Sequence, residues 1–212
     1  MFTGIVTALG TVREAQPIGG GHDLRLVIGT APSFLSEPAP AALGASIACS
    51  GVCLTVVERG GTAGDAWFAV DISGETVSRT VARMWEAGQR LNLEPAMKLG
   101  DELGGHIVTG HVDAVGSIVS AEEVGGSHQF WVKTPADLAP YIAPKGSVTV
   151  DGISLTVNAV EDQPDGTCHF MLNIIPHTAE VTTAGDWQAV SAVNLEIDVL
   201  ARYLQRLQSL RG

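Results

Sequence analysis

The stretch SGVCLTV at residues 50–56 returns as DGISLTV at residues 151–157, so each position lies 101 residues after its counterpart. A recurrence at that distance in a chain of 212 residues indicates two tandem modules of similar build. Two further correspondences support this reading. Residues 109–116 match 3–10 with an offset of 106, and residues 194–196 match 92–94 with an offset of 102. Offsets that differ this little place the insertions in loops, where they cost little.

Composition narrows the class of protein. A hydrophobic fraction of 45% with 17% charged residues gives each module of about 95 residues enough apolar area for a core. The formal net charge of −11 argues against nucleic-acid binding, which needs a basic surface. Three cysteines in no metal-like spacing favour reduced thiols and a cytoplasmic location. The apolar start lacks a basic region and a cleavage site, and no apolar run is long enough to span a membrane.

Short segments rich in β-branched residues, separated by turn residues, predict six strands in the first module. They cover residues 2–12 (with bends), 22–28, 45–49, 52–58, 67–72 and 90–94, and Ser50-Gly51 suits a tight hairpin turn between two of them. A short helix is expected over Glu75 to Met84. We therefore predict an all-β protein with two similar six-stranded antiparallel β-barrels, residues 1–96 and 97–197.

Residues 198–212 are expected to form a C-terminal helix. Its apolar side chains recur at three- and four-residue spacing, at Leu200, Tyr203, Leu204, Leu207 and Leu210. Such a stripe fits an oligomer contact. It fits packing of the helix back on its own barrel equally well.

Two facing barrels of one ancestry would offer two similar pockets in opposite orientation. Two like ligands could then meet, as a reaction between two copies of one molecule requires. Duplication without catalysis is the alternative. A donor and an acceptor copy need unequal pockets, and the repeats do differ in chemistry at Ile5/His111, Cys53/Ser154, Ser50/Asp151 and Ala96/Asp198.

Two of these residues could take part directly in chemistry. His111 is suited to proton transfer near neutral pH, although a lone histidine in a strand is more often structural. Cys53 is a potential nucleophile, although a cysteine between Val52 and Leu54 is usually a small core residue. The sequence shows no order typical of a Ser-His-Asp triad, no nucleotide-binding loop and no cluster of metal ligands.

Several short motifs, in this order along the chain, carry a family resemblance. They are MFTGIV at residues 1–6, GVCLTV at 51–56, GGH at 104–106, TGHV at 109–112 and DGISLTV at 151–157. Together, over residues 1 to about 200, they resemble the riboflavin synthase family, in its α-subunit type with two lumazine-binding repeats. One departure is Ser50, where the family commonly has Asn.

The resemblance implies a homotrimer held by the C-terminal helix, with sites between the N-terminal barrel of one subunit and the C-terminal barrel of the next. It implies that two molecules of 6,7-dimethyl-8-(1-D-ribityl)lumazine exchange a four-carbon unit, giving riboflavin and 5-amino-6-(D-ribitylamino)uracil, without cofactor or metal. In some members of the family a lumazine synthase encloses the enzyme, and such a partner is an open alternative. So is a non-catalytic lumazine or flavin carrier of the same fold, and a purely structural tandem barrel is a third reading.

The resemblance also assigns residues. The catalytic candidates are Ser46, Cys53, His111, Ser154, Thr156 and Asp198, with Phe2 as an apolar wall at the reacting rings. The N-terminal pocket is expected to use Gly4, Ile5, Val6, Val52, Cys53, Leu54, Thr55, Val70, Asp71, Ile72, Ser73, Gly74 and Glu75. The C-terminal pocket is expected to use Thr109, Gly110, His111, Lys145, Ser154, Leu155, Thr156, Asn173, Ile174, Ile175, Pro176, His177 and Thr178. We expect His111 and Ser154 to transfer protons, and Ser46 or Cys53 to support addition at the acceptor ring.

Overall fold

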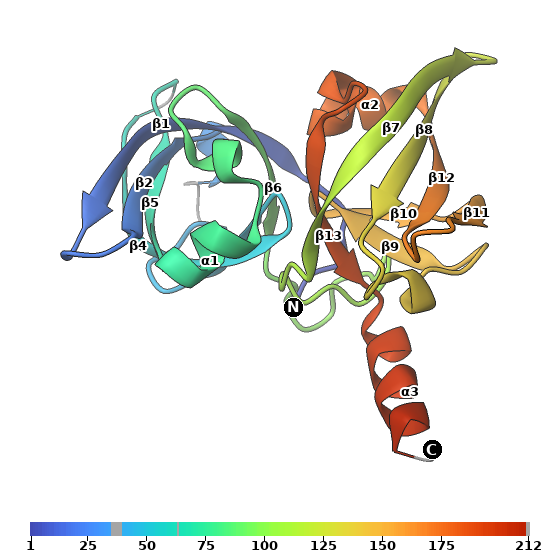
Figure 1. The fold of residues 1–212 in the computed structure, drawn as a ribbon. Coiled ribbons are helices and arrows are strands. Elements are labelled where there is room, and N and C mark those ends of the chain that lie inside the picture. The colour runs from blue at the N-terminus through green and yellow to red at the C-terminus, as the bar shows by residue number, and fades with distance from the viewer. Residues whose placement is uncertain (35–39, 63, 211–212) are drawn as a thin grey trace.

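The first half of the chain folds into a closed antiparallel barrel. The computed structural model describes residues 1–34, 40–62 and 64–210 (Figure 1). Around the barrel the strands run in the order β1-β2-β5-β4-β3-β6. Their bounds are β1 (Ala8–Ile18), β2 (Asp23–Gly29), β3 (Ser46–Cys49), β4 (Val52–Gly60), β5 (Trp67–Ile72) and β6 (Arg90–Pro95). The predicted six strands are therefore confirmed, although β1 begins only at Ala8, and Phe2 makes an isolated bridge with Val108.

The second half repeats this plan with one strand interrupted. Its sheet has the order β10-β9-β13-β7-β8-β12-β11. The bounds are β7 (Ala114–Val124), β8 (Ser127–Thr134), β9 (Ser147–Val150), β10 (Ile153–Thr156), β11 (Ala159–Asp162), β12 (Cys168–Ile174) and β13 (Ala192–Ile197). β10 and β11 form the two edges and are separated only by Val157 and Asn158, so together they occupy the place that β4 fills alone in the first barrel.

Each half has its own apolar core, because alternate side chains of every strand point inward. Phe68, Leu91 and Leu93 are among the fully buried side chains of the first core. Phe170 and Leu172 play this part in the second. The two cores confirm the prediction of two similar β units. They also show why the repeat could be seen in the sequence, since each unit buries the same apolar face.

The two hairpin turns of the repeated stretch face each other between the barrels. Ser50 and Gly51 have φ of 44° and 84°, and Asp151 and Gly152 have 47° and 80°, the left-handed pair of a type I′ turn. A Cβ on Gly51 would lie 2.9 Å from the Gly152 nitrogen, and one on Gly152 would lie 2.6 Å from the Gly51 nitrogen. Glycine is required at both positions by conformation and by this contact.

Two buried asparagines cross between the barrels in a reciprocal way. Asn92 of β6 donates to the Asp151 carbonyl oxygen at 2.8 Å and accepts from the Thr183 nitrogen at 2.8 Å. Asn194 of β13 donates to the Ser50 carbonyl oxygen at 3.0 Å and accepts from the Val81 nitrogen at 2.8 Å. Each asparagine thus satisfies the turn of the opposite barrel, which fixes the two barrels about an approximate twofold axis.

The short helices lie beside this seam. α1 (Gly74–Arg79) is followed by the 3₁₀ turn η2 (Ala82–Trp85), so the predicted helix from Glu75 to Met84 is divided in two. The second repeat has the same pair, α2 (Pro176–Val181) and η4 (Thr183–Asp186). Two further 3₁₀ turns are η1 (Pro32–Phe34) and η3 (Ala139–Tyr141). No described helix is long and apolar enough to cross a membrane.

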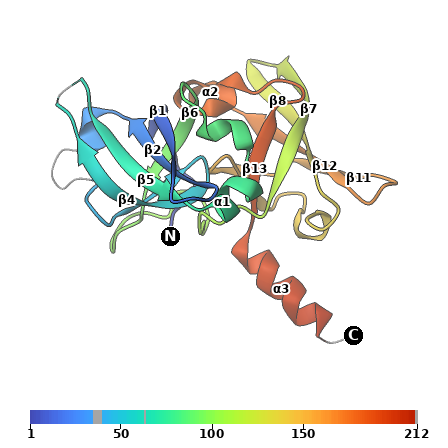
Figure 2. The ribbon, with the colours of Figure 1, turned by 60° about the vertical axis from the view of Figure 1, so that its left-hand side comes forward.

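The C-terminal helix α3 (Val199–Ser209) projects away from both barrels (Figures 1 and 2). Asp198 is its N-cap, accepting from the Leu200 nitrogen at 2.8 Å. The apolar stripe is exposed, with 64% of Leu200, 60% of Leu204 and 55% of Leu207 accessible. In the single chain the helix therefore does not pack its stripe back on the barrel. The last two residues of the predicted segment, 211 and 212, lie outside the described residues.

Candidate functional site

A cavity of about 710 Å³ opens in the first barrel, between its opening segment, β3 and the chain that follows β6. Ser46 lies on β3, opposite Thr55 of β4, and contributes to the cavity wall together with Ile5. The remaining wall is formed by Thr3, Thr7, Pro40, Ala42, Ala45, Glu94, Pro95, Ala96, Met97, Lys98, Asp101, Glu102 and Gly104. This is a largely preformed pocket of the size that small-molecule ligands occupy.

The opening segments of the two repeats exchange places. The Gly4 carbonyl oxygen accepts from the Ser154 nitrogen of the second barrel at 2.8 Å, and the Gly110 carbonyl oxygen accepts from the Cys53 nitrogen of the first at 2.8 Å. Val6 accordingly packs against the second core, and Val112 against the first. This exchange brings Gly4 next to Ser154 and places His111 beside the strand that carries Cys53, a pairing that the sequence repeat alone did not predict.

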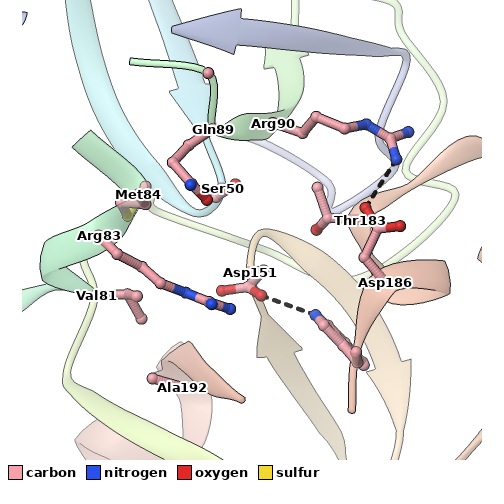
Figure 3. A pocket seen from close by; sticks show the side chains of 12 residues that line it. Ser50, Val81, Arg83, Met84, Gln89, Arg90, Asp151, Thr183, Asp186 and Ala192 are labelled. Carbon is pink, nitrogen blue, oxygen red and sulfur yellow. Dashed lines mark hydrogen bonds and ion pairs between the residues drawn. The ribbon is translucent and has the colours of Figure 1, made fainter. Parts of the chain in front are cut away.

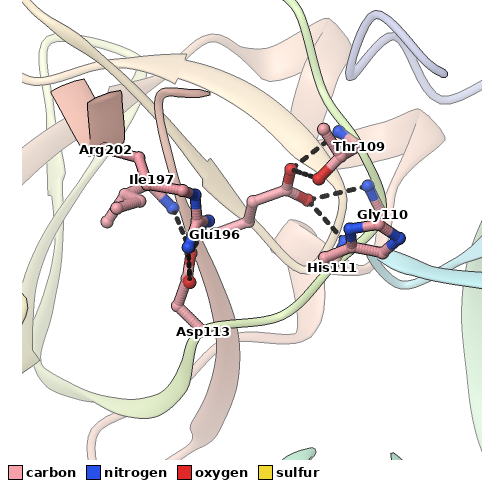
Figure 4. A network of polar contacts seen from close by, with 7 residues as sticks. All are labelled: Thr109, Gly110, His111, Asp113, Glu196, Ile197 and Arg202. Carbon is pink, nitrogen blue, oxygen red and sulfur yellow. Dashed lines mark hydrogen bonds and ion pairs between the residues drawn. The ribbon is translucent and has the colours of Figure 1, made fainter. Parts of the chain in front are cut away.

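A buried carboxylate holds each exchanged segment in place. Glu94 accepts from the Thr3 nitrogen at 2.7 Å, from the Thr3 hydroxyl at 2.8 Å and from the Gly4 nitrogen at 2.9 Å. Glu196 accepts from the nitrogens of Thr109 at 2.7 Å, Gly110 at 3.0 Å and His111 at 3.2 Å, and from the Thr109 hydroxyl at 2.6 Å (Figure 4). Burial raises the pKa of both carboxyls, and these hydrogen bonds oppose that rise.

The surroundings of Cys53 are apolar. Phe2 is fully buried with Ala48 and Val108, and Cys53 and Ala96 pack against this cluster. A Cβ on Gly110 would lie 2.7 Å from the Cys53 Cβ and 3.0 Å from the Phe2 ring. Phe2 therefore packs in the apolar cluster beside Cys53, which is itself half-buried, and its role as a wall at the reacting rings stays a prediction.

The equivalent place in the second barrel is polar. Ser154 is hydrogen-bonded to the Nδ1 of His106 at 2.7 Å, and the Nε2 of His106 is 3.1 Å from the Thr149 hydroxyl. Burial lowers the pKa of His106, and the charge of Asp198 opposes this effect. Thr149 corresponds to Ala48 and Asp198 to Ala96, so the two repeats differ in polarity around Cys53 and Ser154.

His106 is a neighbour of the candidate Ser154 that the sequence reasoning missed. The stretch GGH at residues 104–106 carried the family resemblance, but the histidine received no role there. The only signal in the sequence was the histidine itself. In the structure its backbone nitrogen donates to the Thr3 carbonyl oxygen at 3.1 Å, so this segment is bound to the first repeat. A contact between segments about 50 residues apart, such as His106 with Ser154, is invisible to local pattern.

His111 is exposed, and its ring points away from the Glu196 carboxylate (Figure 4). Among the described residues its side chain has no hydrogen-bond partner, so only its backbone nitrogen is held. A ring placed in this way is free to meet a ligand. Thr156 is also exposed, at the end of β10 opposite Ser147.

The other expected pocket residues differ in how far they are exposed to solvent. Core positions are taken by Val52, Leu54, Val70, Ile72 and Ile174. Two acidic candidates already have partners, Asp71 with Arg25 at 2.7 Å and Glu75 with Arg79 at 2.8 Å. Ser73 is the N-cap of α1. Exposed positions are taken by Thr55, Lys145, Asn173, Ile175, Pro176 and His177, while Gly74, Leu155 and Thr178 are half-buried.

A second cavity, of about 220 Å³, lies at the seam between the barrels (Figure 3). Asp151 accepts there from the Trp187 ring nitrogen at 3.0 Å and from the Asn194 nitrogen at 2.8 Å. Arg90 of the first barrel is paired with Asp186 of the second at 2.8 Å. The residues of this cavity connect the two barrels, and none of them is among the expected site residues.

Comparison with known proteins decides the family. A family model described as the lumazine binding domain matches residues 3–96 and again residues 109–198. A riboflavin synthase of Brucella abortus (strain 2308) is 47% identical over 210 residues, covering 98% of each chain. The chain belongs to the riboflavin synthase family.

Other members of the riboflavin synthase family are similarly close over nearly the full length. The riboflavin synthase of Mycobacterium tuberculosis (strain ATCC 25618 / H37Rv) is 42% identical over 213 residues, covering 100% of both chains. A solved structure of LumP complexed with riboflavin superposes with a TM-score of 0.79 at 25% identity, covering 93% of this chain and 99% of that one. LumP complexed with 6,7-dimethyl-8-(1'-D-ribityl)lumazine, at 23% identity and a TM-score of 0.77 with the same coverage, shows the shared fold.

The seam predicts a pH dependence of stability. Burial raises the pKa of Asp151 to about 7 from its ordinary 3.8, so the folded protein keeps this proton where the unfolded chain has lost it. Stability should therefore fall as the pH rises from about 4 to about 7, by up to ~1.4 kcal/mol per pH unit. Urea unfolding at pH 5 and pH 8 measures the slope. Asp151→Asn should flatten it and the exposed Asp137→Asn should not, whereas equal slopes in all three proteins would contradict the assignment.

Proposed function

We propose that this chain is a riboflavin synthase, a transferase that converts two molecules of 6,7-dimethyl-8-(1-D-ribityl)lumazine into riboflavin and 5-amino-6-(D-ribitylamino)uracil. The observation that carries the proposal is 47% identity to the Brucella abortus riboflavin synthase over 98% of both chains. The two lumazine-binding matches, one in each half, supply the two binding units that a reaction between two identical molecules needs.

The proposed mechanism follows from the unequal repeats. One lumazine must lose a proton from its 7-methyl group, and the ring of the other must be attacked at C7, after which four carbons pass to the acceptor. The substrate ring stabilises the carbanion, so the protein orients the pair and manages protons, and no cofactor or metal is required. His111 and Ser154 are proposed for proton transfer, with Ser46 or Cys53 supporting addition at the acceptor.

The network around Ser154 supports this division of labour. The Ser154 hydroxyl lies 2.7 Å from Nδ1 of the His106 ring. When the hydroxyl takes up a proton, this ring nitrogen is therefore within hydrogen-bond distance. Cys53, at the equivalent position, is packed among Phe2, Ala48 and Ala96. The second repeat is thus equipped for proton transfer, and the first for holding an apolar ring face. Thr156 and Asp198, with the pocket residues named from the sequence, complete the proposed site.

We further propose the domain limits 1–96 and 97–197 for the two lumazine-binding barrels and 198–212 for an oligomerisation helix. The exposed stripe of α3 supports assembly into a homotrimer, because an apolar stripe of this size gains most when a neighbouring subunit covers it. In such a trimer the N-terminal barrel of one subunit would face the C-terminal barrel of the next. A cytoplasmic location suits a chain with three free cysteines, and association with a lumazine synthase is one candidate partnership.

A lumazine or flavin carrier without catalysis is the second candidate function. It is considered because of the structural likeness to LumP complexed with riboflavin at 25% identity, while the 47% identity to a riboflavin synthase favours the enzyme. The carrier and the enzyme differ in one observable, which is turnover of a bound lumazine.

The function is tested by incubating the purified protein with ribityllumazine as the sole substrate. We expect riboflavin and the diaminouracil to appear in equal amounts, at one riboflavin per two lumazines consumed, because the four carbons leave one copy and join the other. Absorbance, fluorescence and chromatography measure both products. Tight binding of lumazine with no riboflavin formed would instead establish the carrier.

Replacing His111 by Ala tests the proposed proton transfer. We expect kcat to fall about 10²-fold or more, the usual contribution of a positioned general acid or base, with a much smaller change in the dissociation constant for ribityllumazine. Steady-state kinetics and fluorescence titration measure the two quantities. His169→Ala, on β12 between Glu161 and Lys133 and in the wall of neither cavity, is the matched control. Equal losses in binding and turnover would remove the proton-transfer role.

The assembly helix is tested by the double variant Leu204→Glu/Leu207→Glu, which places two charges in the exposed stripe. We expect the mass in sedimentation velocity to fall from three times 22.0 kDa to 22.0 kDa. Gln205→Glu/Ser209→Glu adds the same charge on another face of α3 and should leave the trimer intact. A trimer that survives the leucine changes would show that α3 is not the subunit contact.

A further inference from the structure

Arg202 of α3 is joined to Asp113 by a two-pronged ion pair (Figure 4). Nη1 lies 2.7 Å from Oδ1, and Nη2 donates to Oδ2 at 2.9 Å. The Asp113 side chain is only 13% exposed and that of Arg202 is 39% exposed, so the pair is partly shielded from water. Parallel hydrogen bonds of this kind fix geometry as well as adding energy.

Asp113 is held from three sides. Its Oδ2 accepts from the Ile197 nitrogen at 2.9 Å, and its own nitrogen donates to the Leu195 carbonyl oxygen at 2.8 Å. Both of these partners lie on β13, which leads directly into α3. The residue therefore ties together the end of the last strand, the helix and the segment that carries His111, two residues before it.

The charges around this pair depend on one another. Asp113 raises the pKa of Glu196, which shows that the two carboxylates are close enough to repel. The Arg202 guanidinium interacts with both, and the hydrogen bond to Asp113 is the main cause of its own raised pKa. Arg202 thus offsets the repulsion between Asp113, at one end of the His111 segment, and Glu196, which binds the other end at Thr109, Gly110 and His111.

The first repeat serves as an internal comparison. Its carboxylate Glu94 holds Thr3 and Gly4 as Glu196 holds Thr109 and Gly110. At the position of Asp113, however, it has Thr7 (113 minus 106), and among the described residues no helix follows β6 as α3 follows β13. The carboxylate clip is common to both barrels. The Arg–Asp pair is present only in the repeat that carries His111 and the helix, and the first barrel closes without it.

The geometry also fixes the direction in which α3 presents its apolar stripe. Successive helical residues are about 100° apart, so Arg202 lies roughly 200° around the axis from Leu200. With Arg202 bound to Asp113, the side of the helix that carries Leu200, Leu204 and Leu207 faces away from the barrel. One contact therefore acts on both the helix face and the segment that carries His111, in addition to the hydrogen bonds of Glu196.

We propose that Arg202 and Asp113 are a positioning pair for the reaction: their ion pair seats the segment that carries His111 and joins it mechanically to α3. Neither residue touches the substrate in this proposal, and both act through the backbone of His111. The proposal rests on the proposed function, because the position of the His111 segment is measured through the turnover of ribityllumazine. It also predicts that a change in the Arg202–Asp113 contact alters both the orientation of α3 and the position of His111.

The test uses full-length Arg202→Gln and Asp113→Asn, singly and together, with Arg206→Gln as the matched control. Arg206 is exposed on the same helix, and its side chain has no ion pair among the described residues, so the control removes the same charge without the contact. We expect kcat to fall by roughly 10-fold or more in each single variant, because small displacements of a proton-transfer group are costly. The dissociation constant for ribityllumazine should change less than about threefold, because the loss of a partly exposed ion pair changes free energies only slightly.

Two readouts separate positioning from a general loss of structure. The double variant should be no slower than the worse single variant, since each change breaks the same contact. Arg202→Lys, which keeps the charge but not the fork, should recover part of the kcat. Sedimentation velocity on every variant should show the wild-type mass at the assay concentration.

The outcomes are distinct. A wild-type kcat in Arg202→Gln, a loss equal to that of Arg206→Gln, or additive losses in the double variant would each overturn the positioning role. A loss that follows the fraction of dissociated subunits would overturn it too, in favour of assembly alone. Absence of riboflavin formation by the wild-type protein would instead refute the proposed function, so the two failures cannot be confused.

Discussion

Two buried carboxylates, Glu94 and Glu196, hold the exchanged opening segments on which the rest of the site depends. Each stands near the end of the last strand of its barrel and accepts at least three hydrogen bonds from the segment that opens the same barrel. A carboxylate in such a place is costly unless its oxygens are fully used, and here backbone N–H and threonine hydroxyl groups use them. The pinned segments then reach across to the opposite barrel through Gly4 and Gly110.

This exchange joins the two halves into one unit. The contacts that join them are symmetric, but the residues around Cys53 and Ser154 are not. This symmetric frame consists of matched features: paired glycine turns, paired asparagines and paired glutamates. Within it, Cys53 is surrounded by Phe2, Ala48 and Ala96, while Ser154 is bonded to His106 near Thr149. A doubled pocket can bind two copies of one ligand, and unequal surroundings let the two copies react differently. The riboflavin synthase reaction needs both properties.

Polar contacts, more than apolar ones, set the relative placement of the barrels. The seam has Asn92 and Asn194, whose side-chain amides satisfy backbone groups of the opposite turn, and the buried Asp151 beside Trp187. Apolar packing has little directional preference, whereas a satisfied amide fixes both distance and orientation. Cys53 and Ser154 lie on strands that begin just after the two turns, so their separation follows from this seam.

The sequence by itself determined the arrangement of two similar β units, the strand positions of the first unit and the terminal helix, and it placed Phe2 and Gly110, which lie beside Cys53, and Gly4, which lies beside Ser154, among the candidates. It could do so because strand period, turn glycines and the repeat are local signals. Only the tertiary structure decided that the opening segments exchange between barrels, that His106 reaches Ser154, that Asp71 is bound to Arg25, and that Arg202 reaches Asp113. These contacts join residues whose spacing in the chain follows no local period. The exchange joins the two halves at their seam, and the other contacts form within one half, where folding brings distant segments together and polar groups must find partners.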